Sequence, residues 1–349
     1  SWFCGARFIE LKTVQILDEI AVSKPCIYAA DETYNCEWSQ ELKLEQSFDE
    51  YLNAWVLVHA LAHRLGLQEP GMLFNMSVGY NLEGIQHARV QRFIASMRDA
   101  SEFLPAAIDT VAKAYPGVRD IEIPHQLSNH ITLSTMHGCP PAEIERIGQH
   151  LLQELGVDTW VKLNPTLLGP ERLRGLLNQT LGFNIDVPNA AFEHDPVFED
   201  AIGMLKNLAQ VAAGCGRSFG IKLSNTLEVA NKRPIFPPNE KMMYLSGRAL
   251  HPLTLKLAEM VKNELDGTVP ISFCGGADAH NFADLVADGL SPITVCTDLL
   301  KPGGFARLQQ YLVNLEGAMT RLGADNLDAF VHISSGGKGA RFNLAHHAA

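Results

Sequence analysis

The sequence predicts an α/β protein built as a parallel (βα)8 TIM barrel, and two observations lead to this expectation. Short runs of β-branched and apolar residues alternate with longer segments of helical period, which is the pattern of βα units. Polar or reactive residues follow nearly every run, at the point where a strand would end. A barrel gathers all these strand ends around one mouth, whereas an open sheet uses only those near a switch point, so the barrel is favoured.

Seven segments have the apolar character on both faces that strands covered on both sides show. They are Phe8–Thr13, Met72–Val78, His130–Thr135, Thr159–Asn164, Ser218–Ser224, Val269–Cys274 and Pro292–Asp298. Because a complete barrel has eight strands, we expect the first strand to lie upstream of Ser1, so that the barrel is truncated at its N-terminal side.

Amphipathic segments between these runs predict the helices and the domain limits. In 141–155, for example, the apolar residues fall on one stripe of a helix. The segments 29–46 and 100–126 are longer than a plain barrel needs and are expected to be insertions. We therefore expect one barrel domain over residues 1–319, followed by an appendage or linker over 320–349 that contains the run S-S-G-G-K-G at 334–339.

Composition and charge exclude several classes of protein. Acidic residues outnumber basic ones by 39 to 28, and the net charge of −11 argues against a nucleic-acid partner. No window holds about 18 uncharged apolar residues, so no membrane span is expected. The seven cysteines form no C-x-x-C pair and the histidines show no ligand spacing, so no metal site is expected. Such widely spread, odd-numbered thiols are typical of a cytoplasmic protein.

The segment S-T-M-H-G-C-P-P, residues 134–141, joins a predicted strand to a predicted helix. Pro140 and Pro141 suit the first turn of a helix, where a missing N–H costs nothing. Cys139 is therefore expected just before a helix N-terminus, whose partial positive charge stabilises a thiolate. Such a thiol can act as a proton donor, and the alternative is a buried cysteine without a chemical role.

Two lysines, Lys162 and Lys222, each lie inside an apolar strand segment. Because lysine is almost never buried without a partner, each needs an explanation. A lysine that points into a barrel lumen can hold an anionic atom of a cofactor or form a Schiff base. The alternative is a lysine paired with a carboxylate in the core.

The ends of the last two predicted strands carry Gly275-Gly276 and Cys296-Thr297. In TIM barrels the loops after the last two strands frequently bind a phosphate through backbone N–H groups. Glycine allows the backbone to approach the phosphate closely. The alternative is that the glycines only shape a tight turn.

The chain carries seven long motifs, in order I-E-L-K-T-V, F-N-M-S-V-G-Y-N-L-E-G-I, T-L-S-T-M-H-G-C-P-P-A-E-I-E, V-K-L-N-P-T-L-L-G, K-L-S-N-T-L, Y-L-S-G-R-A-L-H-P-L and I-T-V-C-T-D-L-L-K-P-G-G. Over residues 5–317 it resembles the large flavin and iron–sulfur subunit of the selenate reductase family. That subunit is similar to the FMN-binding barrel of dihydropyrimidine dehydrogenase and to the dihydroorotate dehydrogenases. The resemblance implies a barrel of the dihydroorotate dehydrogenase type that binds FMN.

The resemblance also implies roles for individual residues. Cys139 falls where dihydropyrimidine dehydrogenase carries its catalytic acid, and Lys162 matches the lysine beside the flavin ring. The other positions that match cofactor-binding positions are Lys12, Thr13, Asn81, Asn225, Thr226, Ser246, Gly247, Gly275, Gly276, Cys296 and Thr297. The segment Thr132-Leu133-Ser134 lacks an asparagine of the related enzymes, which leaves the substrate unassigned.

The expected function is an FMN-dependent oxidoreductase domain of a larger flavin and iron–sulfur reductase. In that protein, as the resemblance implies, electrons pass from NAD(P)H through FAD and iron–sulfur clusters outside this chain to FMN and a small-molecule substrate. Other domains or subunits of the reductase would be its partners. Two alternatives stay open: a flavin-free lyase or aldolase with a Schiff-base lysine, and a non-catalytic electron-relay or docking domain.

Overall fold

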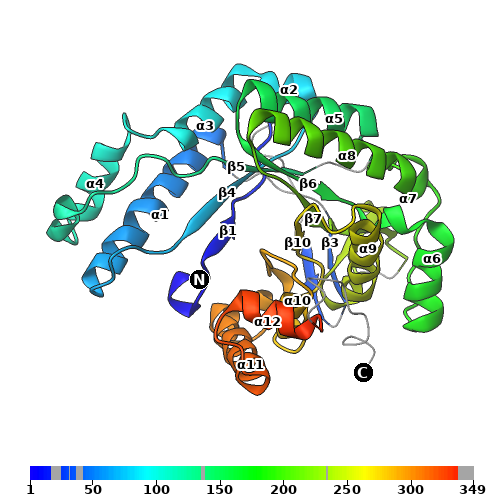
Figure 1. The fold of residues 1–349 in the computed structure, drawn as a ribbon. Coiled ribbons are helices and arrows are strands. Elements are labelled where there is room, and N and C mark those ends of the chain that lie inside the picture. Colours follow the sequence, from blue (N-terminus) through cyan, green and yellow to red (C-terminus); the bar gives the residue numbers. More distant parts are fainter. Residues whose placement is uncertain (17–24, 31, 37–41, 135–137, 233–234, 337–349) are drawn as a thin grey trace.

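The computed structural model describes residues 1–16, 25–30, 32–36, 42–134, 138–232 and 235–336 (Figure 1). Residues 31 and 37–41 of the first expected insertion lie outside the described residues. So do Thr135 at the end of the third expected strand and residues 337–349 of the expected appendage.

Six strands form one parallel sheet in the order β1-β4-β5-β6-β7-β10. Their bounds are β1 Phe8–Glu10, β4 Leu73–Val78, β5 His130–Ser134, β6 Asp158–Leu163, β7 Phe219–Leu223 and β10 Ile271–Phe273. Each strand coincides with one of the first six strands that the sequence predicts. The strand order follows the chain order, as it does in a barrel, where each crossover leads to the neighbouring strand.

The seventh predicted strand, Pro292–Asp298, is reduced to one point of pairing. Ile293 forms a single parallel bridge with Phe273 of β10, and a 3-10 turn already begins at Thr297. Pro292 has no N–H to donate, which shortens the ladder at this edge of the sheet. The expectation of a regular strand here was therefore wrong, although its place beside β10 is correct.

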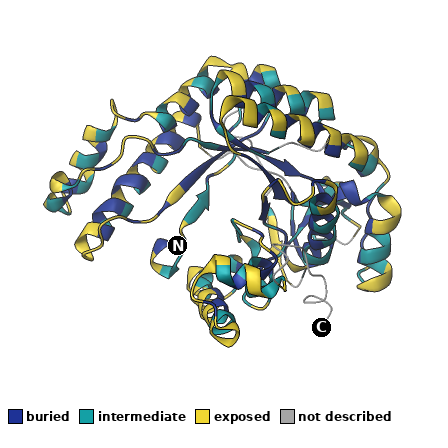
Figure 2. Cartoon of the chain, in the orientation of Figure 1, coloured by how far each residue is buried: buried dark blue, intermediate teal, exposed yellow. Residues whose placement is uncertain are grey.

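Helices cover the outer face of the curled sheet, and their solvent sides are exposed while the strands are buried (Figure 2). Their bounds are α1 Leu44–Arg64, α2 Leu82–Gln86, α3 Ala88–Arg98, α4 Leu104–Ala112, α5 Pro141–Gln149, α6 Pro170–Arg174, α7 Ala190–Glu193, α8 Phe198–Cys215, α9 His251–Glu264, α10 Phe282–Ala287, α11 Arg307–Leu322 and α12 Leu327–Ser334. No helix in the described part of the chain is long and apolar enough to cross a membrane.

The predicted apolar stripe of 141–155 shows why these helices form and where they pack. Ile144 and Ile147 are buried on the inner side of α5. Gly148 lies against Leu208 of α8, so closely that a Cβ atom there would stand 2.7 Å from the leucine side chain. The two helices are therefore neighbours in the outer layer, as Figure 1 shows.

A second, antiparallel sheet has the order β2-β3-β9-β8. Its strands are β2 Ile27–Ala29, β3 Thr33–Asn35, β8 Leu227–Ala230 and β9 Met242–Ser246. Because β8 follows directly on the carboxyl end of β7, this sheet stands at the end of the barrel where a TIM-barrel site is built. The first expected insertion supplies β3, whereas the second contains α4 and a 3-10 turn.

Residues 327–334 of the expected C-terminal appendage form α12, which packs on α10 and α11. Phe330 is buried there together with Ala287, Leu315 and Ala324 in a small apolar cluster apart from the main core.

Candidate active site at the carboxyl ends of the strands

A buried group of three charges lies inside the curled sheet. Glu10 on β1 forms ion pairs with Lys222 on β7 and with Lys162 on β6, the latter at 3.8 Å between Oε1 and Nζ. Lys222 also donates a hydrogen bond of 2.9 Å to Thr294 Oγ1. Since β1 and β7 are separated by three strands in the sheet, these contacts cross the barrel lumen.

Ion pairing favours the ionised forms of Glu10 and Lys162. Burial raises the pKa of Glu10, but Lys222 and Lys162 outweigh it, and the pKa ends below its ordinary value. Burial lowers the pKa of Lys162, and here Glu10 outweighs it, so that the pKa ends above its ordinary value. Two cations against one anion leave a net positive charge in the lumen. The predicted pairing with a core carboxylate is confirmed for both lysines. A role toward a cofactor stays a prediction.

Cys139 precedes the N-terminus of α5, as the two prolines predict. The first turn of that helix carries Glu143, whose Oε1 accepts a hydrogen bond of 2.9 Å from the backbone N–H of Leu82. Leu82 is the first residue of α2, and Asn81 caps that helix through its Oδ1 atom. Cys139 and Asn81 thus lie at the N-termini of α5 and α2, and the Glu143 carboxylate links these two helix ends.

The electrostatic environment of the Cys139 thiol is the opposite of the one that the helix N-terminus predicted. Burial, and after it the charge of Glu143, raises the pKa of Cys139 to about 11. The thiol is therefore protonated at neutral pH. This differs from the stabilised thiolate that the helix N-terminus predicts, because desolvation at this half-buried position and the nearby carboxylate of Glu143 both raise the pKa.

A buried aspartate, Asp195, joins the Cys139 loop to the end of β6. Its Oδ1 accepts a hydrogen bond of 3.0 Å from Gly138 N. Its Oδ2 accepts one of 3.0 Å from Asn164 Nδ2 and one of 2.6 Å from Thr166 Oγ1. Asn225, at the end of β7, donates to Asn164 Oδ1 at 2.7 Å. Cys139 and Asn225 are thereby linked through one polar network.

The segments predicted to bind a phosphate come into contact with one another. A Cβ atom on Gly276 would stand 2.4 Å from the carbonyl oxygen of Gly247, and one on Gly247 would stand 2.8 Å from the Thr297 side chain. Both glycines have a positive φ, of 75° and 76°. Ser246 accepts a hydrogen bond from Thr297 at 3.4 Å. At Gly276, where two backbones approach so closely, only glycine fits.

The backbone donors of this cluster suit a phosphate group. Within the described residues, the N–H groups of Gly247, Gly275, Gly276 and Thr297 donate no hydrogen bond to a protein acceptor. Two of these residues begin 3-10 turns, whose first N–H groups are free by construction. Backbone N–H groups without a protein acceptor, gathered on turns that touch one another, are the kind of donors that bind phosphate. The residues present therefore fit the phosphate of a nucleotide-like cofactor.

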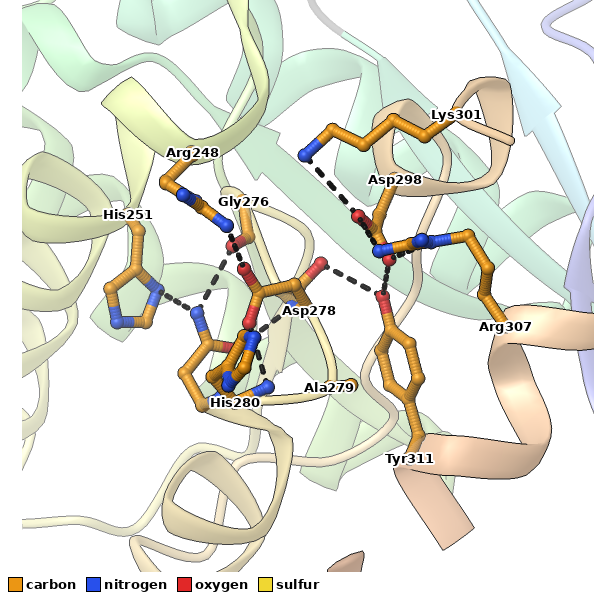
Figure 3. Close-up of polar contacts among 12 residues, drawn as sticks. Arg248, His251, Gly276, Asp278, Ala279, His280, Asp298, Lys301, Arg307 and Tyr311 are labelled. Atoms are coloured by element: carbon orange, nitrogen blue, oxygen red, sulfur yellow. Dashed lines mark hydrogen bonds and ion pairs between the residues drawn. The ribbon is translucent and has the colours of Figure 1, made fainter. Parts of the chain in front are cut away.

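Two acidic side chains tie these segments together, and Figure 3 shows them side by side. Asp278 accepts hydrogen bonds from the backbone N–H of His280, at 2.8 Å, and pairs with Arg248 of the turn after β9. Asn281 donates to the carbonyl oxygen of Gly276 at 3.2 Å, which fixes the glycine turn. The loop after β10 is thus held to the loop after β9.

The second acid, Asp298, follows Thr297 and holds the neighbouring turn to α11. It receives two hydrogen bonds of 2.9 Å from Arg307 and one of 2.8 Å from Tyr311, and Lys301 stands 3.4 Å from its Oδ1 (Figure 3). These partners outweigh burial and lower the pKa of Asp298. Both expected phosphate-side loops are therefore braced by buried carboxylates.

The remaining predicted residues surround the same mouth. Thr13, beyond the end of β1, hydrogen-bonds Ser77 of β4 at 2.7 Å, and Lys12 beside it is exposed. Thr226 is half-buried between β7 and β8. Cys296 lies close enough to Lys162 for the charge of the lysine to lower the pKa of its thiol, although burial raises that pKa more. No cluster of three or more potential metal ligands occurs among the described residues.

Sequence reasoning missed the acids that organise this site. Glu10 carried a usable signal, because a carboxylate inside an apolar strand demands a buried partner. Asp195, in contrast, follows a short helix far along the chain from Gly138. No local sequence pattern predicts its hydrogen bonds to Gly138, Asn164 and Thr166.

Solved structures show the same fold. Two dihydroorotate dehydrogenase structures from Eimeria tenella, one ligand-free and one in complex with ferulenol, each match with a TM-score of 0.55 at 14% identity. The match to the ferulenol complex covers 95% of this chain and 79% of that one. At so low an identity the likeness establishes the barrel architecture.

Curated relatives are considerably closer in sequence. "Putative oxidoreductase YgfK" from Escherichia coli K12 and its counterpart from strain O157:H7 are each 44% identical over 350 residues. The match covers 94% of this chain but 34% of the relative, so the chain spans about a third of the length of those proteins. The family described as oxidoreductase YgfK, N-terminal TIM-barrel domain, matches residues 1–334. The chain belongs to this family of oxidoreductase TIM-barrel domains.

Proposed function

We propose that this barrel is the FMN-binding oxidoreductase domain of a larger reductase. The observation that carries the proposal is the cluster of backbone N–H groups on Gly247, Gly275, Gly276 and Thr297, which have no acceptor in the part of the chain that the structure describes and would fit the phosphate of FMN. It lies at the same barrel mouth as a buried cation, Lys162, and a protonated thiol, Cys139. FMN, when bound, supplies hydride transfer to or from an unsaturated bond of the substrate.

Lys162 is the residue that would face the flavin ring. Its ammonium is kept charged by Glu10, and the two lysines together leave the lumen positive. A fixed positive charge in a water-poor site stabilises negative charge that appears on a neighbouring group during the reaction. Lys222 has Glu10 and Thr294 as partners and serves as the counter-ion that balances the carboxylate.

Cys139 is the proton donor in the direction of substrate reduction. As hydride adds to one carbon of the unsaturated bond, the thiol proton passes to the other, and the resulting thiolate is reprotonated by solvent. A donor must carry its proton at the working pH, and a pKa of about 11 ensures this. Asn164 and Asn225 lie on the same network and offer amide groups to a small polar substrate.

The lumen charges disfavour a Schiff-base lyase. A lysine that attacks a carbonyl must be neutral, which requires a lowered pKa, whereas the pKa of Lys162 is raised.

A non-catalytic relay or docking role differs from the proposed function in one measurable respect. It leaves turnover unchanged in a Cys139→Ala variant, whereas the proposed chemistry requires substrate reduction to fall by about 10²–10⁴-fold.

The further electron carriers would belong to segments outside this chain. The curated relatives are about three times as long as the part that matches, which leaves room for such modules. In the proposed path, electrons from NAD(P)H reach the barrel through FAD and iron–sulfur clusters and leave from FMN to a small substrate.

The test compares FMN with riboflavin, which lacks the phosphate. Titration of the chain with each flavin, followed by fluorescence quenching, should show tighter binding of FMN by at least about 100-fold, because charge-assisted hydrogen bonds to the phosphate are lost with riboflavin. Equal affinities for the two flavins, or no binding of either, would refute the proposed cofactor site.

A further inference from the structure

Among the described residues, the carboxylate of Asp195 connects Gly138, which precedes Cys139, to the barrel wall through hydrogen bonds on both of its oxygens. It lies in the short link between α7 and α8 and is 7% exposed. One oxygen receives the backbone N–H of Gly138, which immediately precedes Cys139. The other receives Asn164 and Thr166, which follow β6.

A second contact confirms that the two segments lie against each other. A Cβ atom on Gly138 would stand 3.7 Å from the Cβ of His194, the residue before Asp195. Gly138 has a φ of 89°, a conformation that an L side chain rarely adopts, so the backbone turns sharply at the residue that meets Asp195. The turn and the carboxylate together fix where the chain enters Cys139.

We propose that Asp195 is the positioning residue of the proton-donating Cys139: it holds the Gly138–Cys139 backbone against Asn164 and Thr166 at the end of β6. This inference rests on the proposed function for the role of Cys139. The positional part of it depends only on contacts within this chain. Asp195 acts through the loop and does not itself exchange a proton with the substrate.

The Asp195→Asn variant should release the loop selectively. An asparagine has one carbonyl oxygen and one NH₂ group in place of two acceptor oxygens. The oxygen of the asparagine accepts the hydrogen bonds of Asn164 and Thr166, because both of them donate. The NH₂ group then faces the N–H of Gly138, and two donors cannot form a hydrogen bond with each other. The link to β6 survives while the link to the Cys139 loop is broken.

The experiment follows the alkylation of individual cysteines by iodoacetamide at pH 8, with each site quantified by mass spectrometry of peptides. In Asp195→Asn, the alkylation rate of Cys139 should rise about tenfold, because an opened loop exposes a thiol that is half-buried in the wild type. Exposed Cys215 provides an internal reference for reagent activity, and buried Cys36 reports on the core.

Two matched variants serve as controls. Thr166→Val removes one donor from the β6 side and leaves both oxygens of Asp195 in place, so the rate at Cys139 should stay as in the wild type. Asp298→Asn removes a buried carboxylate with a similar number of hydrogen bonds elsewhere in the barrel, and it too should leave Cys139 unchanged.

An unchanged Cys139 rate in Asp195→Asn overturns the proposal, and so does a rise that Cys36 shares, since that reports general loosening. If the variant does not fold, hydrogen exchange of the Gly138 amide in the wild-type chain decides: protection of at least about tenfold supports the bond to Asp195, and exchange at the unprotected rate overturns it. Normal turnover in Cys139→Ala would refute the proposed function while leaving the alkylation result intact.

Discussion

The carboxylate of Glu10 on β1 pairs with the ammonium of Lys222 on β7, across the interior of the barrel. The first and fifth strands of the sheet are thereby joined by charge through the lumen, in addition to the hydrogen-bonded ladder around the wall. Lys162 on β6 pairs with the same carboxylate. The single negative charge of Glu10 therefore balances one of the two lysine charges inside the barrel. The same three residues therefore set the charge inside the barrel and link β1 to β6 and β7 across it.

We expect Glu10→Gln to lower the free energy of unfolding by about 3 kcal/mol, because it leaves two buried ammonium groups without their counter-ion. Urea denaturation at pH 7 measures this loss. The double variant Glu10→Gln/Lys222→Met removes the acid and one of the cations, so its loss should be smaller than the sum of the two single losses. Strict additivity would mean that the two residues do not interact.

The contribution of Glu10 to stability should vanish in acid. Its pKa is below the ordinary value of 4.5 in the folded protein, although burial alone would raise it. A carboxylate with a depressed pKa stabilises the fold above its unfolded pKa, and this stability is lost as the pH falls through the folded pKa. The difference in unfolding free energy between wild type and Glu10→Gln should therefore be largest near neutrality and shrink below about pH 4.5. A difference that stays constant down to pH 3 would contradict this assignment.

The sequence predicted the barrel well because periodicity and strand-end chemistry are local signals. Every second residue of Met72–Val78 is apolar, and Val161 and Leu163 repeat this spacing in Thr159–Asn164, so both strands can be predicted from periodicity. The exception, Pro292–Asp298, is apolar and β-branched as well, but Pro292 lacks the N–H that a regular ladder needs. Periodicity carries no information about that.

Residues of the site could be predicted from the sequence only where the residue type is rare in that position. Lys162 and Lys222 stood out because a strand rarely buries an ammonium group, and their partner could have been sought among the buried acids. The state of Cys139 was not accessible in this way. Its pKa depends on the balance between the dipole of α5 and the burial imposed by surrounding elements, and only the fold sets that balance.

If FMN binds beside Lys162, the Lys162→Met variant should lower the two-electron midpoint potential of the flavin by roughly 20–90 mV. A cation near the ring favours the reduced, negatively charged flavin by about 1–4 kcal/mol, and 30 mV corresponds to about 1.4 kcal/mol for two electrons. Lys222→Met should shift the potential less, because Glu10 and Thr294 already occupy that ammonium. Dye equilibration of both variants measures the shifts, and a larger one for Lys222 would reverse the assignment of the two lysines.

The alkylation rate of Cys139 should rise with pH about tenfold per unit and level off only near pH 11, since the thiolate is the reactive form. Removing the nearby negative charge in Glu143→Gln should lower the pKa and raise the rate at pH 8. Glu145→Gln, on the same helix, is a suitable control because Glu145 does not contribute to the raised pKa of Cys139. Equal rates in wild type and Glu143→Gln would show that burial alone sets the pKa.

Alanine at Gly276 should separate the close backbone contact from ordinary glycine effects. The new Cβ would stand 2.4 Å from the carbonyl oxygen of Gly247, at a φ of 75° that an L residue rarely adopts. We expect a loss of about 2–4 kcal/mol in unfolding free energy from strain and overlap, measured by urea denaturation. Gly203, inside α8, has no atom within 4 Å of where a Cβ would stand, so Gly203→Ala should stabilise the protein by about 0.5–1 kcal/mol.

Flavin titration of the two variants then tests the proposed phosphate site. Gly276→Ala should lose the preference for FMN over riboflavin, and Gly203→Ala should keep it. Retention of that preference in a folded Gly276→Ala chain would place the phosphate elsewhere, because the two backbones could not keep their contact around an added methyl group.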